Sequence, residues 1–138
     1  MKKLLVIILL QLNPALAHET DLKCLAKNIY HEARGEPRHG KLAVAQVTLN
    51  RQRDPRWQGT VCQVVYQPYQ FSWTSKKRTE PQEFDSWIEA LELAEKVLQQ
   101  GYALVKFPAT HYHNQQVLPE WSPKLIPLRR IGQHTFYY

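Results

Sequence analysis

Apolar residues between positions 21 and 34 recur every three or four residues, as they do along one face of an α-helix. These residues are Leu22, Leu25, Ala26, Ile29 and Ala33. Thr20 followed by Asp21 is typical of a helix start, and Gly35 is typical of a helix end. The pattern therefore predicts a first helix over about residues 21–34.

Three further helices follow from the same kind of pattern. Residues 42–47 are apolar on nearly every side, so a helix over residues 41–53 should lie at the centre of the core. A short helix is expected after Thr60, whose hydroxyl is suited to capping it. Apolar residues at helical spacing between positions 87 and 98 predict a fourth helix, which Gly101 ends.

The remaining segments are not helical in pattern. Residues 67–83 are polar and contain two prolines, so they are expected to form a long surface loop, and loops of this length often carry function. Short alternating stretches at 109–113 and 131–137 predict two strands of a small antiparallel sheet. The sequence therefore predicts one α+β domain with a mostly helical core.

The first 17 residues have the layout of a secretory signal peptide. Lys2 and Lys3 precede an almost wholly apolar run, and Ala15 and Ala17 are the small residues that a signal peptidase reads. Cleavage after Ala17 would export residues 18–138 to the periplasm or the medium, without stable insertion in the membrane. The alternatives are an uncleaved anchor or a buried first helix.

Cysteine content agrees with export. Cys24 and Cys62 are the two cysteines of the chain, and in an oxidising compartment they are expected to form one disulfide. Closing that loop would stabilise the fold by roughly 3–4 kcal/mol in the chain-entropy model. Two free buried thiols are the alternative.

Loss of Lys2 and Lys3 with the signal peptide would lower the net charge from +6 to +4, and this positive excess weakly favours an anionic polymer as partner, such as cell wall or nucleic acid. One dense basic run, Lys76-Lys77-Arg78, lies in the polar segment and is typical of a solvated loop. An exported protein rarely meets nucleic acid, so no nucleic-acid partner is expected.

Glu32 is the first candidate for chemistry. On a helical wheel it lies about 20° from Leu25, at the margin of the apolar stripe, and it belongs to the last turn of the predicted helix. Partial burial and the helix dipole would both raise the pKa of its carboxyl group, as a general acid requires. The structural alternative is an ion pair with Arg34 or a hydrogen bond to Asn28.

Glu36 is the other carboxylate near this helix. It follows Gly35, so the helix does not determine where its side chain points. A two-carboxylate glycosidase would use Glu36 as its second acid. Capping of the next helix or orientation of Arg34 is the structural alternative, and it is the one that we favour.

A series of motifs runs in order through nearly all of residues 18–138. They are IYHEARGEP at 29–37, AVAQV at 43–47, LNR at 49–51, QFSW at 70–73, ATHYHN at 109–114 and IGQHTFY at 131–137. In this order they resemble the SleB-type cell wall hydrolase family, which includes the spore cortex-lytic enzymes.

The resemblance implies a lysozyme-like α+β fold and cleavage of peptidoglycan between N-acetylmuramic acid and N-acetylglucosamine. It implies a lytic transglycosylase that works with one acid/base, which maps onto Glu32, and with no metal or cofactor. Glycan strands would be the partner of this single domain, which is expected to act as a monomer. The expected sugar contacts are hydrogen bonds from Gln70, Tyr112 and Asn114, and ring faces from Phe71, Trp73 and Trp121. These aromatic residues equally suit a core.

Two other functions are compatible with the same residues. His111 and His113 share one face of a predicted strand, and His134 lies in the next strand, so together they are candidates for a zinc site in a wall amidase or peptidase. A non-catalytic peptidoglycan-binding module would use the same cleft without chemistry.

Overall fold

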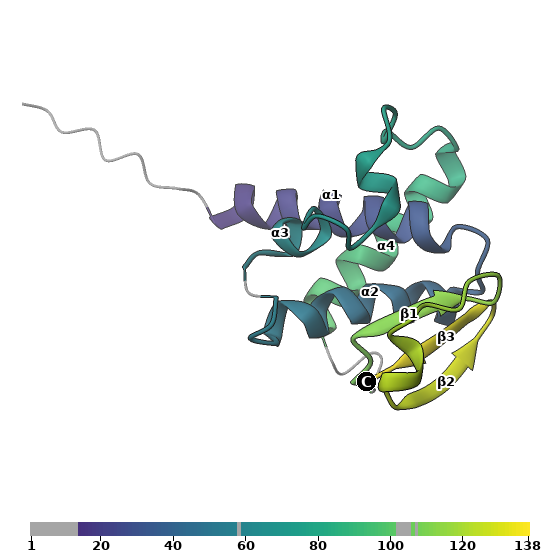
Figure 1. Cartoon of the computed structure of the whole chain (residues 1–138). Coiled ribbons are helices and arrows are strands. Elements are labelled where there is room, and N and C mark those ends of the chain that lie inside the picture. Colours follow the sequence, from purple (N-terminus) through teal and green to yellow (C-terminus); the bar gives the residue numbers. More distant parts are fainter. Residues whose placement is uncertain (1–13, 58, 102–105, 107) are drawn as a thin grey trace, which may run out of the picture.

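A computed structural model describes residues 14–57, 59–101, 106 and 108–138, and Figure 1 shows how its elements are arranged. The helices are α1 (Pro14–Ala33), α2 (Arg38–Arg53), α3 (Val61–Val65) and α4 (Phe84–Gln100), with short 3-10 turns η1 (Ser72–Ser75) and η3 (Ser122–Lys124). The strands are β1 (His111–Asn114), β2 (Pro127–Ile131) and β3 (His134–Tyr137). All four predicted helices are present, and the mostly helical α+β fold with a small antiparallel sheet is confirmed.

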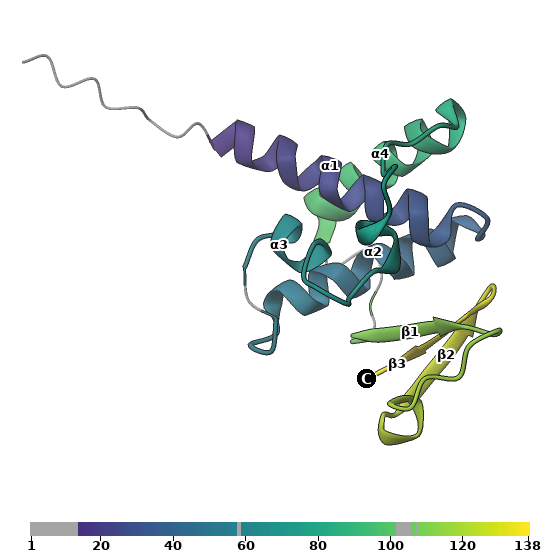
Figure 2. The ribbon, with the colours of Figure 1, turned by 45° about the horizontal axis from the view of Figure 1, so that its top comes forward.

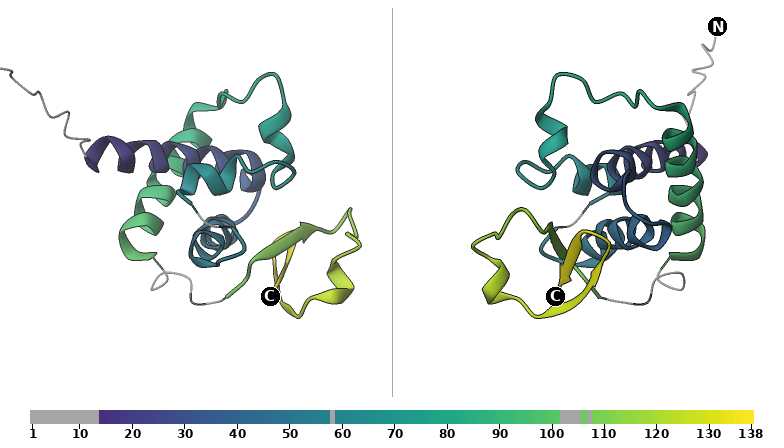
Figure 3. Two further views of the ribbon diagram at one scale, coloured as in Figure 1. Left: turned by 60° about the vertical axis from the view of Figure 1, so that its left-hand side comes forward. Right: turned by 90° about the vertical axis from the view of Figure 1, so that its right-hand side faces the viewer.

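Helix α2 lies at the centre of the fold, as its apolar sequence predicts. Its residues Ala43, Val44, Ala45 and Val47 are wholly buried. In Figure 3 α2 is seen along its axis, with α1 and α3 above it, α4 on one side and the sheet on the other. A helix that is covered on every side needs apolar residues all round, which is why no polar face separates them in the sequence.

The first helix begins earlier than predicted, at Pro14 instead of about residue 21. The sequence pattern placed the start at Thr20 and Asp21 because these residue types commonly cap helices, but the backbone is already helical before them. Residues 1–13, which hold the charged and apolar parts of the predicted signal peptide, lie outside the described residues. In the part of the chain that is described, no helix is long and apolar enough to span a membrane.

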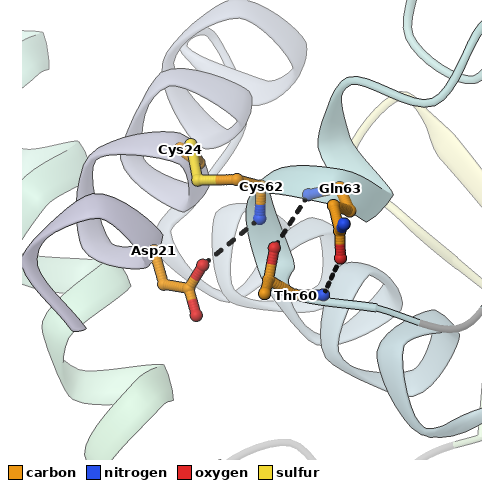
Figure 4. The surroundings of a disulfide bond; sticks show 5 residues. All are labelled: Asp21, Cys24, Thr60, Cys62 and Gln63. Carbon is orange, nitrogen blue, oxygen red and sulfur yellow. Dashed lines mark hydrogen bonds between the residues drawn. A yellow bond between two sulfur atoms is a disulfide. The ribbon is translucent and has the colours of Figure 1, made fainter. Parts of the chain in front are cut away.

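A disulfide joins α1 to α3, and it is the pair that the sequence predicts. Cys24 and Cys62 are bonded, with their Cα atoms 5.2 Å apart (Figure 4). Next to the bond, Asp21 accepts a hydrogen bond from the backbone N–H of Cys62. Thr60 caps α3 and exchanges hydrogen bonds with Gln63 in a capping box. A five-residue helix is too short to be stable alone, and these contacts hold it against α1.

The sheet has the order β1-β3-β2, and both pairings are antiparallel. Figure 2 shows it as a separate layer beside the helices, with β1 nearest to them. A small apolar cluster joins the layers and consists of Ala33, Ala43, Val44, Val47, Ala109, Ile131 and Phe136. The sheet is therefore held against the beginning of α2 by side chains from β2 and β3.

The sequence predicts one strand where the structure has a hairpin. The predicted strand over 131–137 is divided by a turn at Gly132 and Gln133, and the preceding residues form β2, which was not predicted. Gly132 has a φ of 57°, a left-handed conformation that glycine adopts without cost. The carboxylate of Glu36 accepts a hydrogen bond from the backbone N–H of Gln133 at 2.9 Å. The turn is therefore tied to the segment that links α1 and α2.

We expect Gly132→Ala to destabilise the protein by about 1–3 kcal/mol. A Cβ atom at this position would collide with the Glu36 carboxylate, and the positive φ would strain any L-residue. Chemical denaturation measures the loss. Gly35→Ala is the matched control because a Cβ there meets nothing within 4 Å. Equal stabilities of the two variants would contradict this account of the turn.

Candidate active site

A cleft of about 680 Å³ lies between the helical body and the sheet. On the helical side it is lined by His31, Glu32, Arg51, Tyr69, Gln70 and Ser72. On the sheet side it is lined by His111, Tyr112, His113, Asn114, Val117 and Trp121. Residues that are far apart in the sequence thus meet at one concave surface, which is the ordinary form of a ligand site.

Glu32 lies in the last turn of α1, and its carboxyl group is in the cleft. The hydroxyl of Tyr112 donates a hydrogen bond to Glu32 Oε2 at 2.7 Å. Burial raises the pKa of the Glu32 carboxyl above its ordinary value. The Tyr112 hydrogen bond and the charges of Arg51 and Lys76 oppose that rise but do not cancel it. Glu32 therefore holds its proton to higher pH than an exposed glutamate does.

Tyr112 positions Glu32, which differs from the role that the sequence analysis gives it. Its hydroxyl was expected to bind sugar, but in the structure it is directed at the Glu32 carboxylate. Burial, followed by the charge of Glu32, raises the pKa of the Tyr112 hydroxyl well above its usual value, so the group remains a hydrogen-bond donor. Ring contacts with His134 and Phe136 hold the phenol in this orientation.

We expect Tyr112→Phe to raise the pKa of Glu32 further. The lost hydrogen bond is one that favours the ionised carboxylate, while the ring contacts of residue 112 are kept. A pH titration of the Glu32 carboxyl carbon by NMR measures the change. Tyr69→Phe removes a hydroxyl from another residue that lines the cleft, and it should leave the midpoint unchanged. A midpoint that falls in Tyr112→Phe would contradict the assignment.

Arg51 is a residue of the site that the sequence analysis did not single out. Its side chain is on α2 and only 6% exposed, and its Nε donates to the backbone carbonyl of Thr110 at 2.7 Å. The guanidinium lies 5.2 Å from the ring centre of Trp57 and 5.3 Å from that of Phe71. These contacts fix a positive charge in the wall of the cleft.

Two carboxamides, those of the sugar-binding candidates Gln70 and Asn114, line the cleft, and each is held through its oxygen. Gln70 Oε1 accepts a hydrogen bond from the indole Nε1 of Trp57 at 3.2 Å. Asn114 Oδ1 accepts one from the backbone N–H of Gln116 at 3.0 Å. Gln70 belongs to the helical wall and Asn114 to the end of β1, so the two carboxamides come from opposite sides of the cleft.

Phe71 was expected to present a ring face to sugar, and this expectation is wrong. Its side chain is only 4% exposed and belongs to the main hydrophobic core, as does that of Trp73. Side chains alternate along this segment, so Gln70 and Ser72 line the cleft while Phe71 and Trp73 point inward. The Trp73 indole donates to the buried carboxamide of Asn28 at 2.9 Å, which gives this core position its polar partner.

Trp121 does line the cleft, where it contacts histidines of β1. Its ring centre is 5.1 Å from that of His111 and 5.8 Å from that of His113. Burial, followed by the charge of Arg51, lowers the pKa of His111 to about 4, so this histidine is neutral at physiological pH. The Trp121 ring and the neutral imidazole of His111 form a flat, uncharged part of the wall.

The geometry does not favour the zinc site. Both ring nitrogens of His113 have partners: Nδ1 is 2.7 Å from the carbonyl oxygen of Asn114, and Nε2 is 2.9 Å from the hydroxyl of Tyr137. Within the described residues, no group of three histidine, cysteine, aspartate or glutamate side chains is placed to hold a metal ion.

Glu36, the candidate second carboxylate, is not among the residues that line the cleft. Its Oε2 accepts the hydrogen bond from the Gln133 backbone that ties down the β2–β3 turn. This is a structural role of the kind that the sequence analysis favoured. In the described part of the chain, Glu32 is therefore the one acidic side chain in the cleft lining.

Comparison with solved structures reveals the same fold in two bacterial proteins. The catalytic domain of the germination-specific lytic transglycosylase SleB from Bacillus anthracis superposes with a TM-score of 0.74 and 26% sequence identity, over 87% of this chain and 95% of that domain. The catalytic domain of the Bacillus cereus SleB protein superposes with a TM-score of 0.71 and 24% identity, over 87% and 91% of the two chains, and this second likeness bears on the fold alone.

Sequence comparison leads to the same group. The chain is 28% identical over 116 residues to the spore cortex-lytic enzyme of Bacillus subtilis (strain 168), covering 84% of this chain and 37% of that protein. It is 29% identical over 121 residues to that of Oceanobacillus iheyensis, covering 86% and 41%. The chain thus matches about two fifths of the length of these relatives. Residues 35–137 match the model of the Cell Wall Hydrolase family, and the chain belongs to this family.

Proposed function

We propose that this protein cleaves the glycosidic bond between N-acetylmuramic acid and N-acetylglucosamine in peptidoglycan, as a lytic transglycosylase with Glu32 as its acid and base. The observation that carries the proposal is a partly buried carboxyl group of raised pKa, hydrogen-bonded to Tyr112 in an open cleft, with no second carboxylate in the described lining. A single group that both donates and accepts a proton suits a reaction that needs no activated water.

The first step is proton donation. Glu32 gives its proton to the glycosidic oxygen while the bond from that oxygen to the anomeric carbon of muramic acid breaks, and positive charge develops on the sugar ring. The electron pair of the broken bond leaves with the oxygen, which becomes the hydroxyl group of the departing glucosamine. Glu32 is then a carboxylate, which the Tyr112 hydroxyl stabilises through its hydrogen bond.

The second step restores the acid. The carboxylate of Glu32 takes the proton of the muramic C6 hydroxyl, whose oxygen attacks the anomeric carbon and closes a 1,6-anhydro ring. No water is consumed, and Glu32 regains its proton for the next cycle. The fixed charge of Arg51 supports this cycle because it lowers the pKa of Glu32, which burial alone would hold higher.

The location, oligomeric state and cofactor requirement that we propose follow from the same function. The substrate would be glycan strands in the periplasm or the medium, reached after removal of residues 1–17, and the protein would act as a monomer without cofactor. The relatives are spore cortex-lytic enzymes, and the spore cortex is a wall outside the cytoplasm. The cleft supports peptidoglycan in general as the substrate, without restriction to that of spores.

Mass spectrometry of products tests the proposal. The full chain is incubated with purified peptidoglycan, with and without a metal chelator, and the released muropeptides are identified. We expect anhydro-muramic ends, lighter by one water than the products of hydrolysis, in equal amount with the chelator present. Reducing muramic ends would overturn the transglycosylase mechanism. Intact glycan with cut peptides would overturn the proposed function, and loss of activity with the chelator would favour the zinc alternative.

A further inference from the structure

The orientation of Gln70 is determined by Trp57. An indole N–H can only donate a hydrogen bond, so the atom of Gln70 that lies 3.2 Å from Trp57 Nε1 is the carbonyl oxygen. The NH₂ group of Gln70 has no hydrogen-bond partner among the described residues. Since Gln70 lines the cleft, that NH₂ group is what it offers to a ligand.

Asn114 is held in the same way on the opposite wall. Its Oδ1 accepts from the backbone N–H of Gln116, another group that can only donate. The NH₂ group is again left without a partner in the described part of the chain. Both walls of the cleft therefore offer a carboxamide donor whose oxygen is already engaged.

The positive charge of Arg51 also favours a ligand that brings an acceptor oxygen. The guanidinium of Arg51 lines the cleft, and its Nη1 is buried without a hydrogen-bond partner in the described structure. A ligand beside these groups is favoured when it brings an acceptor oxygen and disfavoured when it brings a cation. In an N-acetylated sugar the amide carbonyl is such an acceptor, whereas a sugar that has lost its acetyl group carries an ammonium group in the same place.

We propose that the cleft selects N-acetylated glycan over de-N-acetylated glycan, and that Gln70, oriented by Trp57, is the residue that determines this specificity. The inference rests on the proposed function and narrows its substrate class. Gln70 would donate to the carbonyl oxygen of one acetamido group, and Asn114 to that of a neighbouring sugar. A free amine at either place would meet a donor that it cannot satisfy, and at Gln70 it would also meet the positive charge of Arg51, which contacts the same Trp57.

The test compares two substrates in one assay. Peptidoglycan is divided, one half is chemically N-deacetylated, and cleavage of both halves is measured with the full chain as kcat and KM. We expect kcat/KM to be at least about tenfold higher on the acetylated half, chiefly through KM. Equal cleavage of both halves would overturn this inference and leave the proposed function standing. Cleavage of neither half would instead count against the proposed function.

Two substitutions test whether Gln70 and Trp57 cause the preference for acetylated glycan. Gln70→Glu keeps the shape of the side chain but replaces the donor by a carboxylate, so we expect the preference to fall at least tenfold or to reverse toward the amine-bearing substrate. Trp57→Phe removes the N–H that orients Gln70 and keeps an aromatic ring near Arg51, so we expect a smaller, several-fold loss of preference. A preference that persists in Gln70→Glu would overturn the assignment.

Gln67→Glu is the matched control. It introduces the same negative charge three residues away, at a side chain outside the cleft lining. The ratio of the two kcat/KM values should equal that of the unsubstituted protein. If Gln67→Glu shifted the ratio as much as Gln70→Glu, a general charge effect would account for the change, and the specific role of Gln70 would be refuted.

Discussion

Glu32→Gln is expected to lower the rate of peptidoglycan cleavage by at least about 10³-fold, because in the proposed mechanism one carboxyl group serves as both acid and base. Glutamine has nearly the same shape and can still accept the hydrogen bond from Tyr112, but it has no proton to give. Binding of glycan fragments to the variant should remain within about threefold. Turbidity of a wall suspension and calorimetric binding measure the two quantities.

A measurement of stability distinguishes this loss of cleavage rate from misfolding of the variant. The folded protein holds the pKa of Glu32 above its unfolded value, so the contribution of this group to stability is present at low pH and is lost as pH rises through the folded pKa. At neutral pH a glutamine avoids that loss. The melting temperature of Glu32→Gln at pH 7 should therefore equal or exceed that of the unsubstituted protein, and a clear decrease would contradict the burial argument.

Glu36→Gln provides the matched control, with the same chemical change four residues away. Its side-chain oxygen can still accept the hydrogen bond from Gln133, and the residue does not line the cleft. Its cleavage rate should stay within a few fold of the unsubstituted protein. If Glu32→Gln retained the rate while Glu36→Gln lost it, the assignment of the acid would be refuted. If both retained wall binding and the unsubstituted protein cleaved nothing, the protein would be a binding module.

Removing the disulfide is expected to have the largest effect on stability. Replacing Cys24 and Cys62 by alanine opens a loop with 38 residues of sequence separation, which costs roughly 3–4 kcal/mol through the greater freedom of the unfolded chain. For a domain of this size the melting temperature should fall by about 10–15 °C. Calorimetry of the double variant measures the decrease.

Reduction of the unsubstituted protein serves as the control for this variant. The reduced protein should melt near the temperature of the double variant, because both lack the same covalent link. At low temperature both should still cleave peptidoglycan, since neither cysteine lines the cleft. A melting temperature that reduction leaves unchanged would show that the link between α1 and α3 contributes little to stability.

Features that depend on neighbouring residues were predictable from the sequence. The four helices follow from apolar spacing, and the burial of Glu32 follows from its place at the margin of one such stripe. The pairing of Cys24 with Cys62 could be predicted without a structure because these are the two cysteines of the chain. Gln70, Asn114 and the cleft itself were expected from the resemblance to a known family, which contains information that local patterns lack.

Features that depend on distant contacts were predicted less well. An aromatic residue suits a core and a sugar site equally, so the sequence could not show on which side Phe71 lies. The structure decides, because it shows which side chains of this segment point into the core. The β2–β3 turn was missed because Gly132 and Gln133 fit a strand pattern until the contact with Glu36 is known.

Arg51 could have been found in the sequence. It lies four residues after Val47, on the same face of a helix that is apolar all round, and a charge at such a position is buried. Buried charges are costly and persist where they have a role. The signal was present, but its interpretation required knowing that Thr110 and Trp57 surround the guanidinium.

The order of strands has a consequence for synthesis of the protein on the ribosome. Strand β3 is the middle strand of the sheet, although it is the last of the three to be translated, and β1 and β2 each pair with it. Tyr112, in β1, comes 80 residues after its partner Glu32. Until residues 134–137 emerge, β1 has no partner strand to hold Tyr112 in place. A nascent chain therefore carries Glu32 long before the hydrogen bond from Tyr112 can form, and the centre proposed to cleave wall glycan is assembled only with the last few residues of this sheet.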